Sequence, residues 1–206
     1  GRLPVTLAPI DSFPTELAGT WPAVLTRDEH PGGGEAKVPT AGALRFPTLA
    51  YRAAYQEGLL IGYRWFDKRK LRVTYPFGFG LGYTRFTASD LAVAPTGEGM
   101  RFTVRLTNVG PRDGSTVLQL YAAQPGAEGD RPDRILRGFA KVAVRRGGES
   151  RATIDVPWRS LARYDVASRR WIADAGDYRI QLGFSSRDLP LETVVKLPRA
   201  LSFDFP

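Results

Sequence analysis

Three stretches in the second half of the chain alternate apolar and polar residues with a period of two. The alternation runs through 100–107, 151–158 and 178–184, and its apolar members are Met100, Phe102, Val104 and Leu106; Ala152, Ile154, Val156 and Trp158; and Tyr178, Ile180, Leu182 and Phe184. Successive side chains of a strand point to opposite faces of a sheet, so each stretch buries one face and exposes the other. The pattern predicts three half-buried β-strands.

Weaker strand patterns fill the rest of this region. They cover 91–93, 116–122, 139–144 and 191–197, and turn signals such as Asn108-Val109-Gly110-Pro111, Asp113-Gly114, Gly147-Gly148 and Ala175-Gly176-Asp177 separate the strands. Seven or so short strands without a helical period indicate a β-sandwich. Tyr178 begins a late strand, where it is either a tyrosine corner or a plain core residue.

Residues 1 to about 84 follow a different pattern, rich in Pro and Gly. Val5-Thr6-Leu7 is a candidate short strand, 26–40 reads as an exposed loop, and Leu59–Tyr63 is an apolar run that predicts a buried strand. This region shows no contiguous core of its own. We therefore expect it to pack on something outside the chain.

Composition narrows the classes of function. The net charge is +8, but the basic residues are scattered, and the tightest clusters, Lys68-Arg69-Lys70 and Arg145-Arg146, fall where turns are expected. A nucleic-acid interface needs clustered basic residues and a reading element, so this function is disfavoured.

No apolar run approaches the roughly 20 residues that cross a bilayer. Without cysteine there is no disulfide or thiolate chemistry. The chain begins with Gly1 and has Met100 as its only methionine, so we expect a fragment or a processed product.

A search for catalytic side chains finds few candidates. The single histidine, His30, lies in a glycine-rich loop without a nucleophile elbow, and its neighbours Asp28 and Glu29 are a weak metal signal. Neither Gly32-Gly33-Gly34 nor the glycines of 78–82 end in the sequence of a phosphate loop. The glycines of 78–82 instead indicate a turn in which backbone passes tightly between aromatic rings.

Glycoside hydrolysis uses two carboxyl groups that face each other across the scissile bond. The candidates in the first region are Glu16, Glu29, Glu35, Glu57 and Asp67, and nothing in the sequence fixes a pair. Glu57 precedes an apolar run, where a structural role such as pairing with Arg64 is favoured over catalysis.

Aromatic residues gather before the predicted sandwich: Tyr63, Trp65, Phe66, Tyr75, Phe77, Phe79 and Tyr83. They could form a platform for stacking sugars, or they could fill an interface between domains. The interleaved glycines favour packing between domains, since they permit close contact but build no open groove.

Three blocks carry a resemblance to a known family. Gly1–Thr6, Glu57–Asp67 and Tyr75–Thr84, in this order, resemble the closing part of a family-3 glycoside hydrolase, the β-glucosidase-type enzymes. The sequence after Thr84 resembles the fibronectin type III-like domain of that family. The blocks that match it are Asn108-Val109-Gly110, Val117–Tyr121, Leu136–Phe139, Trp171 and Gly176-Asp177-Tyr178.

The resemblance implies a mainly β chain: an immunoglobulin/fibronectin type III-like β-sandwich preceded by the C-terminal remnant of an α/β sandwich domain. That remnant would cover residues 1–70, a linker 71–85, and the sandwich 86–206. In the family the nucleophilic aspartate and the acid/base glutamate lie in a barrel-type domain and the α/β domain, before the position that matches Gly1. The resemblance therefore implies no catalytic, cofactor-binding or metal-binding residue in this chain, and no cofactor.

The sequence departs from the family in two places. The family commonly has histidine and serine at the positions of Phe79 and Gly82, so hydrogen bonds made there in relatives are not expected here. The stretch Lys37–Tyr55 is longer than usual and has no assigned role.

Two functions remain open. The first is the C-terminal portion of a retaining β-glycosidase of carbohydrate metabolism, inactive alone, whose partners are the missing barrel and α/β domains and whose β-glucoside substrate binds only the whole protein. The resemblance favours a periplasmic or secreted location for it, with no nucleic-acid or membrane partner. The second is an autonomous sandwich that binds carbohydrate or another surface partner; a basic module that binds acidic polymers is a further variant.

Overall fold

A computed structural model describes residues 2–9, 58–126, 129 and 131–204. A helix, a turn of 3-10 helix and ten strands are found in them: α2 Tyr63–Lys68, η3 Trp158–Leu161, β1 Phe86–Pro95, β2 Gly99–Asn108, β3 Gly114–Ala123, β4 Ile135–Val144, β5 Glu149–Pro157, β6 Arg163–Asp165, β7 Arg170–Ala173, β8 Gly176–Gly183, β9 Leu191–Leu197 and β10 Leu201–Phe203. The helix found among these residues is not long and apolar enough to cross a membrane.

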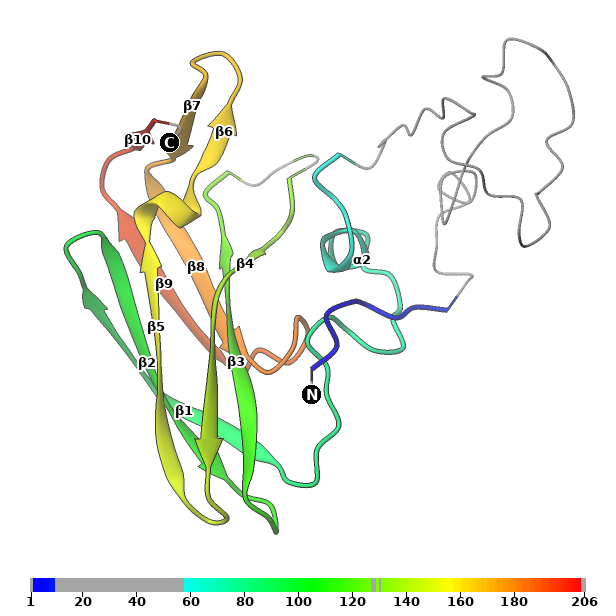
Figure 1. Cartoon of the computed structure of the whole chain (residues 1–206). Helices are drawn as coiled ribbons and strands as arrows, with labels where there is room; N and C mark the ends of the chain where they lie inside the picture. Colours follow the sequence, from blue (N-terminus) through cyan, green and yellow to red (C-terminus); the bar gives the residue numbers. More distant parts are fainter. Residues whose placement is uncertain (1, 10–57, 127–128, 130, 205–206) are drawn as a thin grey trace, which may run out of the picture.

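The strands form two facing antiparallel sheets, β1–β2–β5 and β4–β3–β8–β9, and a small sheet, β10–β7–β6, at one end (Figure 1). The predicted fold, a mainly β chain with a fibronectin type III-like sandwich, is confirmed. Each strand predicted from alternation lies within or overlaps one of β1 to β5, β8 and β9. Apolar side chains of both sheets meet in one core, in which Phe102, Leu106, Leu120 and Leu182 are almost completely buried.

The alternation in β2 and β5 matches the burial residue by residue. Val104 and Leu106 are buried while Arg101 and Arg105 between the core positions are exposed, and Ala152, Ile154 and Val156 of β5 face the same core. Trp158 was predicted to continue this strand, but it begins η3. Pro157 ends the ladder, and the Trp158 amide instead donates to the carbonyl of Glu98 at 2.9 Å.

Leu59–Tyr63 was predicted as a buried strand, and this prediction was wrong. Gly58 and Gly62 have φ values of 55° and 58°, which a strand does not allow, and α2 begins at Tyr63. Leu59 and Ile61 are 63% and 54% exposed, while Leu60 is buried. The run is therefore a turn that leads into a short helix.

The candidate strand Val5-Thr6-Leu7 is reduced to one bridge. Leu7 pairs antiparallel with Tyr75, and its amide donates to the Tyr75 carbonyl at 2.9 Å. The predicted loop 26–40 and the stretch Lys37–Tyr55 lie outside the described residues.

Tyr178 combines the two roles that its sequence position left open. Its ring is fully buried in the core, and its hydroxyl donates to the backbone oxygen of Asp174, four residues upstream, at 2.8 Å. This bond to upstream backbone is the feature that defines a tyrosine corner. Burial, and after it the charge of Asp174, raises the pKa of the Tyr178 phenol to about 12.

A charge in the shared core should unfold the sandwich. Leu106→Asp should abolish cooperative unfolding in urea, because an unpaired carboxylate would be buried at a cost of several kcal/mol. Val194→Asp is the control, since Val194 lies on the outer face of β9 and is 58% exposed. Native-like circular dichroism and melting of Leu106→Asp would contradict the strand register.

Tyr178 should make stability fall at alkaline pH. Below pH about 10 the phenol is protonated in both states, whereas between about 10 and 12 the unfolded chain loses its proton and the folded chain keeps it. The free energy of unfolding should therefore decrease over this window, and Tyr178→Phe should decrease less. At neutral pH the variant should lose about 1 kcal/mol with its hydrogen bond. Urea unfolding at pH 7 to 12 tests this, with Tyr164→Phe as an exposed control; identical alkaline profiles for Tyr178→Phe and wild type would refute it.

Candidate functional site

A network of polar contacts joins the Pro- and Gly-rich first region of the chain to the outer face of β3. Leu118, Leu120 and Ala122 of β3 face the sandwich core, which places Gln119 and Tyr121 on the opposite face. Both are nevertheless buried, because residues 2–9 and 58–85 lie against that face (Figure 1). We call this contact the junction.

Aromatic rings form the apolar part of the junction. Tyr63 of α2 packs edge-on against Tyr121 with ring centroids 5.7 Å apart, and Phe77 lies 5.1 Å from Tyr63. Burial, followed by the nearby Tyr63 and Asp67, raises the pKa of Tyr121, so its hydroxyl is a permanent hydrogen-bond donor at neutral pH. It donates to the side-chain oxygen of Gln119 at 2.6 Å.

Asp67 supplies the central anion of the junction. Its side chain is 7% exposed, and its two oxygens accept from Arg187 Nε at 3.0 Å and Arg134 Nη2 at 3.1 Å. Arg187 also donates to the carbonyls of Phe66 and Leu71, and Arg134 to the carbonyl of Ser186. One carboxylate therefore fixes the end of α2 to both the β3–β4 loop and the loop after β8.

Further hydrogen bonds run along both sides of this cluster. The Leu136 amide of β4 donates to the Tyr63 hydroxyl at 2.8 Å, and the Ser186 amide donates to the Phe77 carbonyl at 2.8 Å. Lys68 pairs with Asp133 at 3.1 Å. The junction thus uses both backbone and side-chain groups of the sandwich.

Gly78 shows why a glycine is needed within Phe77-Gly78-Phe79. Its φ is +81°, and a Cβ atom at this position would collide with the Gln119 side chain. The tight turn predicted for 78–82 is therefore found at Gly78, although its close neighbour is the Gln119 amide rather than a pair of rings.

Arg2 extends the junction to the start of the described chain. Its guanidinium donates to Thr116 Oγ1 at 2.6 Å and to the Gly78 carbonyl at 3.4 Å, and it lies 5.7 Å from the centre of the Phe184 ring. Burial lowers the pKa of Arg2, partly offset by Asp188. The Leu3 amide donates to the Phe79 carbonyl at 2.7 Å, so residues 2–9 run along 74–79.

An apolar groove of about 470 Å³ lies on the outer side of the junction. Its walls are Arg2, Leu3, Leu7, Tyr75, Phe79, Gly80 and Leu81. Leu81 is 80% exposed, and the rings of Tyr75 and Phe79 lie with their centroids 4.9 Å apart and their planes tilted by 37°. The aromatic cluster predicted from sequence is therefore divided. Tyr63, Phe66 and Phe77 pack inside the junction, Tyr75 and Phe79 line the groove, Trp65 lies 4.9 Å from the Arg69 guanidinium, and Tyr83 is exposed.

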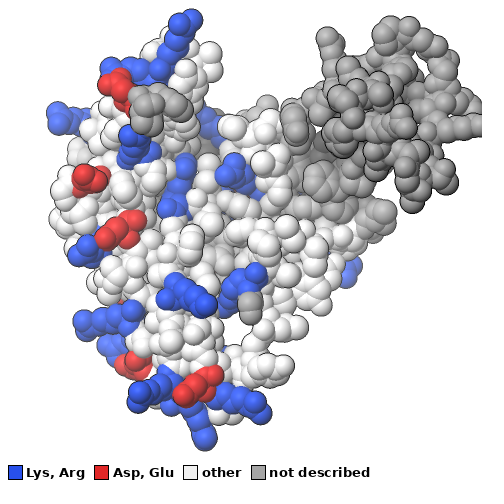
Figure 2. Space-filling view, viewed as in Figure 1, with Lys and Arg blue, Asp and Glu red and all other residues white. Residues whose placement is uncertain are grey.

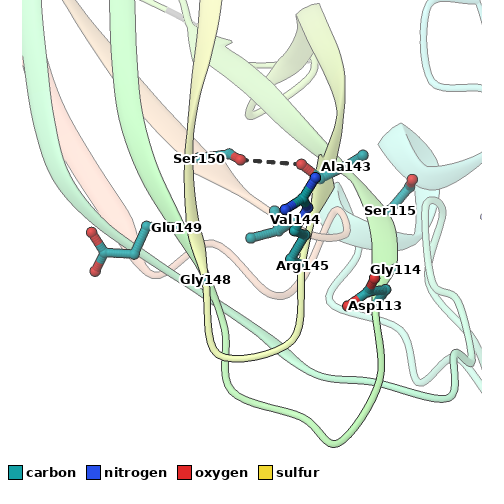
Figure 3. A pocket seen from close by; sticks show the side chains of 9 residues that line it. All are labelled: Asp113, Gly114, Ser115, Ala143, Val144, Arg145, Gly148, Glu149 and Ser150. Carbon is teal, nitrogen blue, oxygen red and sulfur yellow. Dashed lines mark hydrogen bonds between the residues drawn. The ribbon is translucent and has the colours of Figure 1, made fainter.

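Three described carboxylates, Asp67, Asp113 and Glu149, are each held by basic or amide groups. Asp67 is held by two arginines, and a pocket at the far end of the sandwich contains Asp113 and Glu149 (Figure 3). Asp113 accepts from the Arg146 amide at 2.7 Å, Glu149 pairs with Arg105 at 3.3 Å, and their side chains lie on different sides of the β4–β5 turn.

The other sequence candidates, Glu16, Asp28, Glu29, His30, Glu35 and Glu57, lie outside the described residues, so the pairing of Glu57 with Arg64 stays a prediction. Among residues 2–9, 58–126, 129 and 131–204, no three His, Asp or Glu side chains gather to hold a metal ion. The basic residues are spread along the visible face, several of them beside acidic ones (Figure 2).

The ion pairs of the junction could not be predicted from the sequence. Asp67 was one of five candidate carboxylates, and Arg134 and Arg187 were not singled out. One local feature pointed to Asp67. It comes directly after Trp65-Phe66, and a carboxylate that is buried beside such residues needs a cation.

Comparisons with known proteins agree with this architecture. Residues 116–186 match the family described as Fibronectin type III-like domain. A β-glucosidase of Rhizobium radiobacter is 42% identical over 156 residues, which are 74% of this chain and 19% of the relative. The thermostable β-glucosidase B of Acetivibrio thermocellus is 32% identical over 191 residues, 88% of this chain and 25% of the relative.

Solved structures give the same relation. β-Glucosidase 3B from Thermotoga neapolitana, in complex with glycerol, superposes with a TM-score of 0.67 at 33% identity over 72% of this chain and 21% of its own. The GH3 β-glucosidase of Bifidobacterium adolescentis gives a TM-score of 0.67 at 34% identity, over 76% and 23%. The chain is a C-terminal part of a β-glucosidase-like protein of glycoside hydrolase family 3. This C-terminal part spans about a fifth to a quarter of the length of its relatives.

Removing the junction anion should loosen the first region while the sandwich stays folded. Asp67→Ala leaves two partly buried guanidinium groups without their carboxylate, at a cost of about 1–3 kcal/mol after allowance for their exposure. Amide hydrogen exchange of 58–85 should accelerate, and that of β2 and β5 should not. Asp155→Asn, which breaks an exposed pair with Arg101, is the matched control. Unchanged exchange in Asp67→Ala would show that the ion pairs do not hold the junction.

Proposed function

We propose that this chain orients and stabilises the catalytic part of a retaining β-glucosidase and supplies no reacting carboxylate itself. In the whole protein, barrel and α/β domains would bind the β-glucoside and carry the nucleophile and the acid/base. Residues 1–70 would complete the α/β domain, 71–85 would link it to the sandwich, and 86–206 would form the sandwich. The relatives named β-glucosidase support the reaction class.

The junction is the observation that carries this proposal. Its central carboxylate is saturated by two arginines, so Asp67 serves as an anchor and is a poor nucleophile or proton donor. Two residues of the predicted linker also contact the sandwich, since the Leu71 carbonyl accepts from Arg187 and the Phe77 carbonyl accepts from the Ser186 amide.

Several apolar side chains and buried polar atoms of the first region have no partner in the described structure. Leu59, Ile61 and Leu81 are more than half exposed, and Thr6 Oγ1 and Trp65 Nε1 are buried without a hydrogen-bond partner in the described structure. Exposed apolar side chains beside unsatisfied polar atoms are typical of a surface that packs on another part of a protein. We assign this surface, including the apolar groove, to contact with the preceding domains.

Reconstitution of the enzyme from two separately produced parts tests the proposal. The 206-residue chain alone should not hydrolyse an aryl β-glucoside, and adding the separately produced upstream part should restore hydrolysis. Leu81→Asp should lower the restored rate at least about tenfold, since a charge would be buried in the groove. Val166→Asp is the matched control, because Val166 is 79% exposed but lies in the β6–β7 turn at the opposite end.

Two results would overturn this function. Hydrolysis by the chain alone that Glu57→Gln abolishes would place a catalytic acid here. Retention of the chain on an insoluble glucan, lost on Tyr83→Ala, would instead favour the autonomous binding module, since Tyr83 is 87% exposed.

A further inference from the structure

A second opening lies between the two sheets, beside the junction, whose Tyr63 hydroxyl accepts from the backbone amide of the wall residue Leu136. β4 and β5 are edge strands of their sheets, and at the end near η3 they border an open depression of about 590 Å³. Its walls are Leu136, Arg137, Pro157, Arg159, Ser160, Ala162 and Trp171. Figure 1 shows η3 and the β6–β7 hairpin at this end of the sandwich.

Arg137 occupies this opening because of a β-bulge. Leu120 pairs with Gly138 and Tyr121 with Leu136, so Arg137 is the extra residue of β4 and has no opposite residue on β3. A bulge of this kind redirects a side chain away from the normal alternation. It places the guanidinium among the walls of the opening.

The Arg137 guanidinium has no anionic partner in the described part of the chain. Its Nε is buried without a hydrogen-bond partner, and no carboxylate pairs with it within the described ranges. Neighbouring arginines differ: Arg163 pairs with Asp174 at 2.8 Å and with Asp165 at 3.2 Å. Acidic residues are thus present at this end of the sandwich, but they are used elsewhere.

The local field favours an anion in the opening. Burial, and then the like charge of Arg64, lowers the pKa of Arg137, so this site concentrates positive charge that no described carboxylate neutralises by an ion pair. Arg159 contributes a second guanidinium, of which Nη2 donates to the backbone oxygen of Asp204 at 3.2 Å. Arginine offers five donors, so both groups retain free donors for a ligand.

The remaining walls suit a small ring. Trp171 is partly buried, fixed by an edge-on contact with Tyr164 at 5.7 Å, and Leu136, Pro157 and Ala162 add apolar surface. An indole beside a cation is a common arrangement for a ligand with both a flat apolar face and an anionic group.

We propose that this opening binds a sugar carboxylate of monosaccharide size, with Arg137 and Arg159 on the carboxylate and Trp171 on the ring. A uronic acid is the simplest such ligand. The site uses neither of the arginines that bind Asp67 and does not rest on the proposed role in the β-glucosidase, and it would make the sandwich selective for acidic saccharides.

Binding of glucuronate to the full 206-residue chain tests the proposal by calorimetry and by Trp fluorescence. Glucuronate should bind at least about tenfold more tightly than glucose, because the ion pair to Arg137 is lost with the neutral sugar. Arg137→Gln and Arg159→Gln should each weaken glucuronate binding, Arg137→Gln by about tenfold or more. Both variants should melt as wild type does, since neither guanidinium forms an ion pair in the described structure.

Arg151→Gln is the matched control, an exposed arginine on the outer face of β5. It should leave glucuronate binding unchanged. Equal affinity for glucose and glucuronate, or an equal loss in Arg151→Gln and Arg137→Gln, would overturn the site. Inorganic sulfate that binds as tightly as glucuronate would overturn the assignment of the sugar ring.

Discussion

The buried Asp67 carboxylate between Arg134 and Arg187 is the interaction on which the arrangement of the two regions depends. A carboxylate that is 7% exposed is stable only when cations and hydrogen bonds replace its water. The two arginines come from loops that are 53 residues apart in the sequence (187 − 134) and meet only when β3, β4 and β8 are assembled. The first region can therefore dock in this way only on a completed sandwich.

This dependence explains why β3 has unusual burial for a sandwich strand. Leu118 and Leu120 face the core, and Gln119 and Tyr121 face the first region, yet all four are buried. A strand with one solvated face would show polar residues at 119 and 121 in direct contact with water. Here Gln119 and Tyr121 bond to each other, and Gly78 provides the space in which Gln119 fits. The residues on the two sides of the junction therefore fit each other.

The sequence allowed most of the sandwich to be predicted, because alternation is a local signal that a two-sheet core imposes on each strand. Short elements escaped: β6, β7 and β10 have three or four residues each, too few for a period to appear. Leu59–Tyr63 was misread because its apolar composition was weighed above Gly58 and Gly62, whose positive φ values forbid a strand. The polar side of the junction and the unpaired Arg137 depend on long-range contacts and on a bulge, and neither leaves a local pattern.

In the proposed function, the rigidity of the junction would bear on catalysis by the preceding domains. Catalysis by two carboxylates requires that they be held within a fraction of an ångström, and an error of about 1 Å remote from the chemistry can cost about a hundredfold in rate. A domain that attaches through a saturated anion, two aromatic contacts and several backbone hydrogen bonds has little freedom to tilt. The preceding domains, packed on the apolar groove, would then be held in a fixed orientation to the sandwich. In the proposed enzyme the sandwich would contribute to the reaction through geometry, and Asp67, Gly78 and Arg187 would be the residues that hold its orientation.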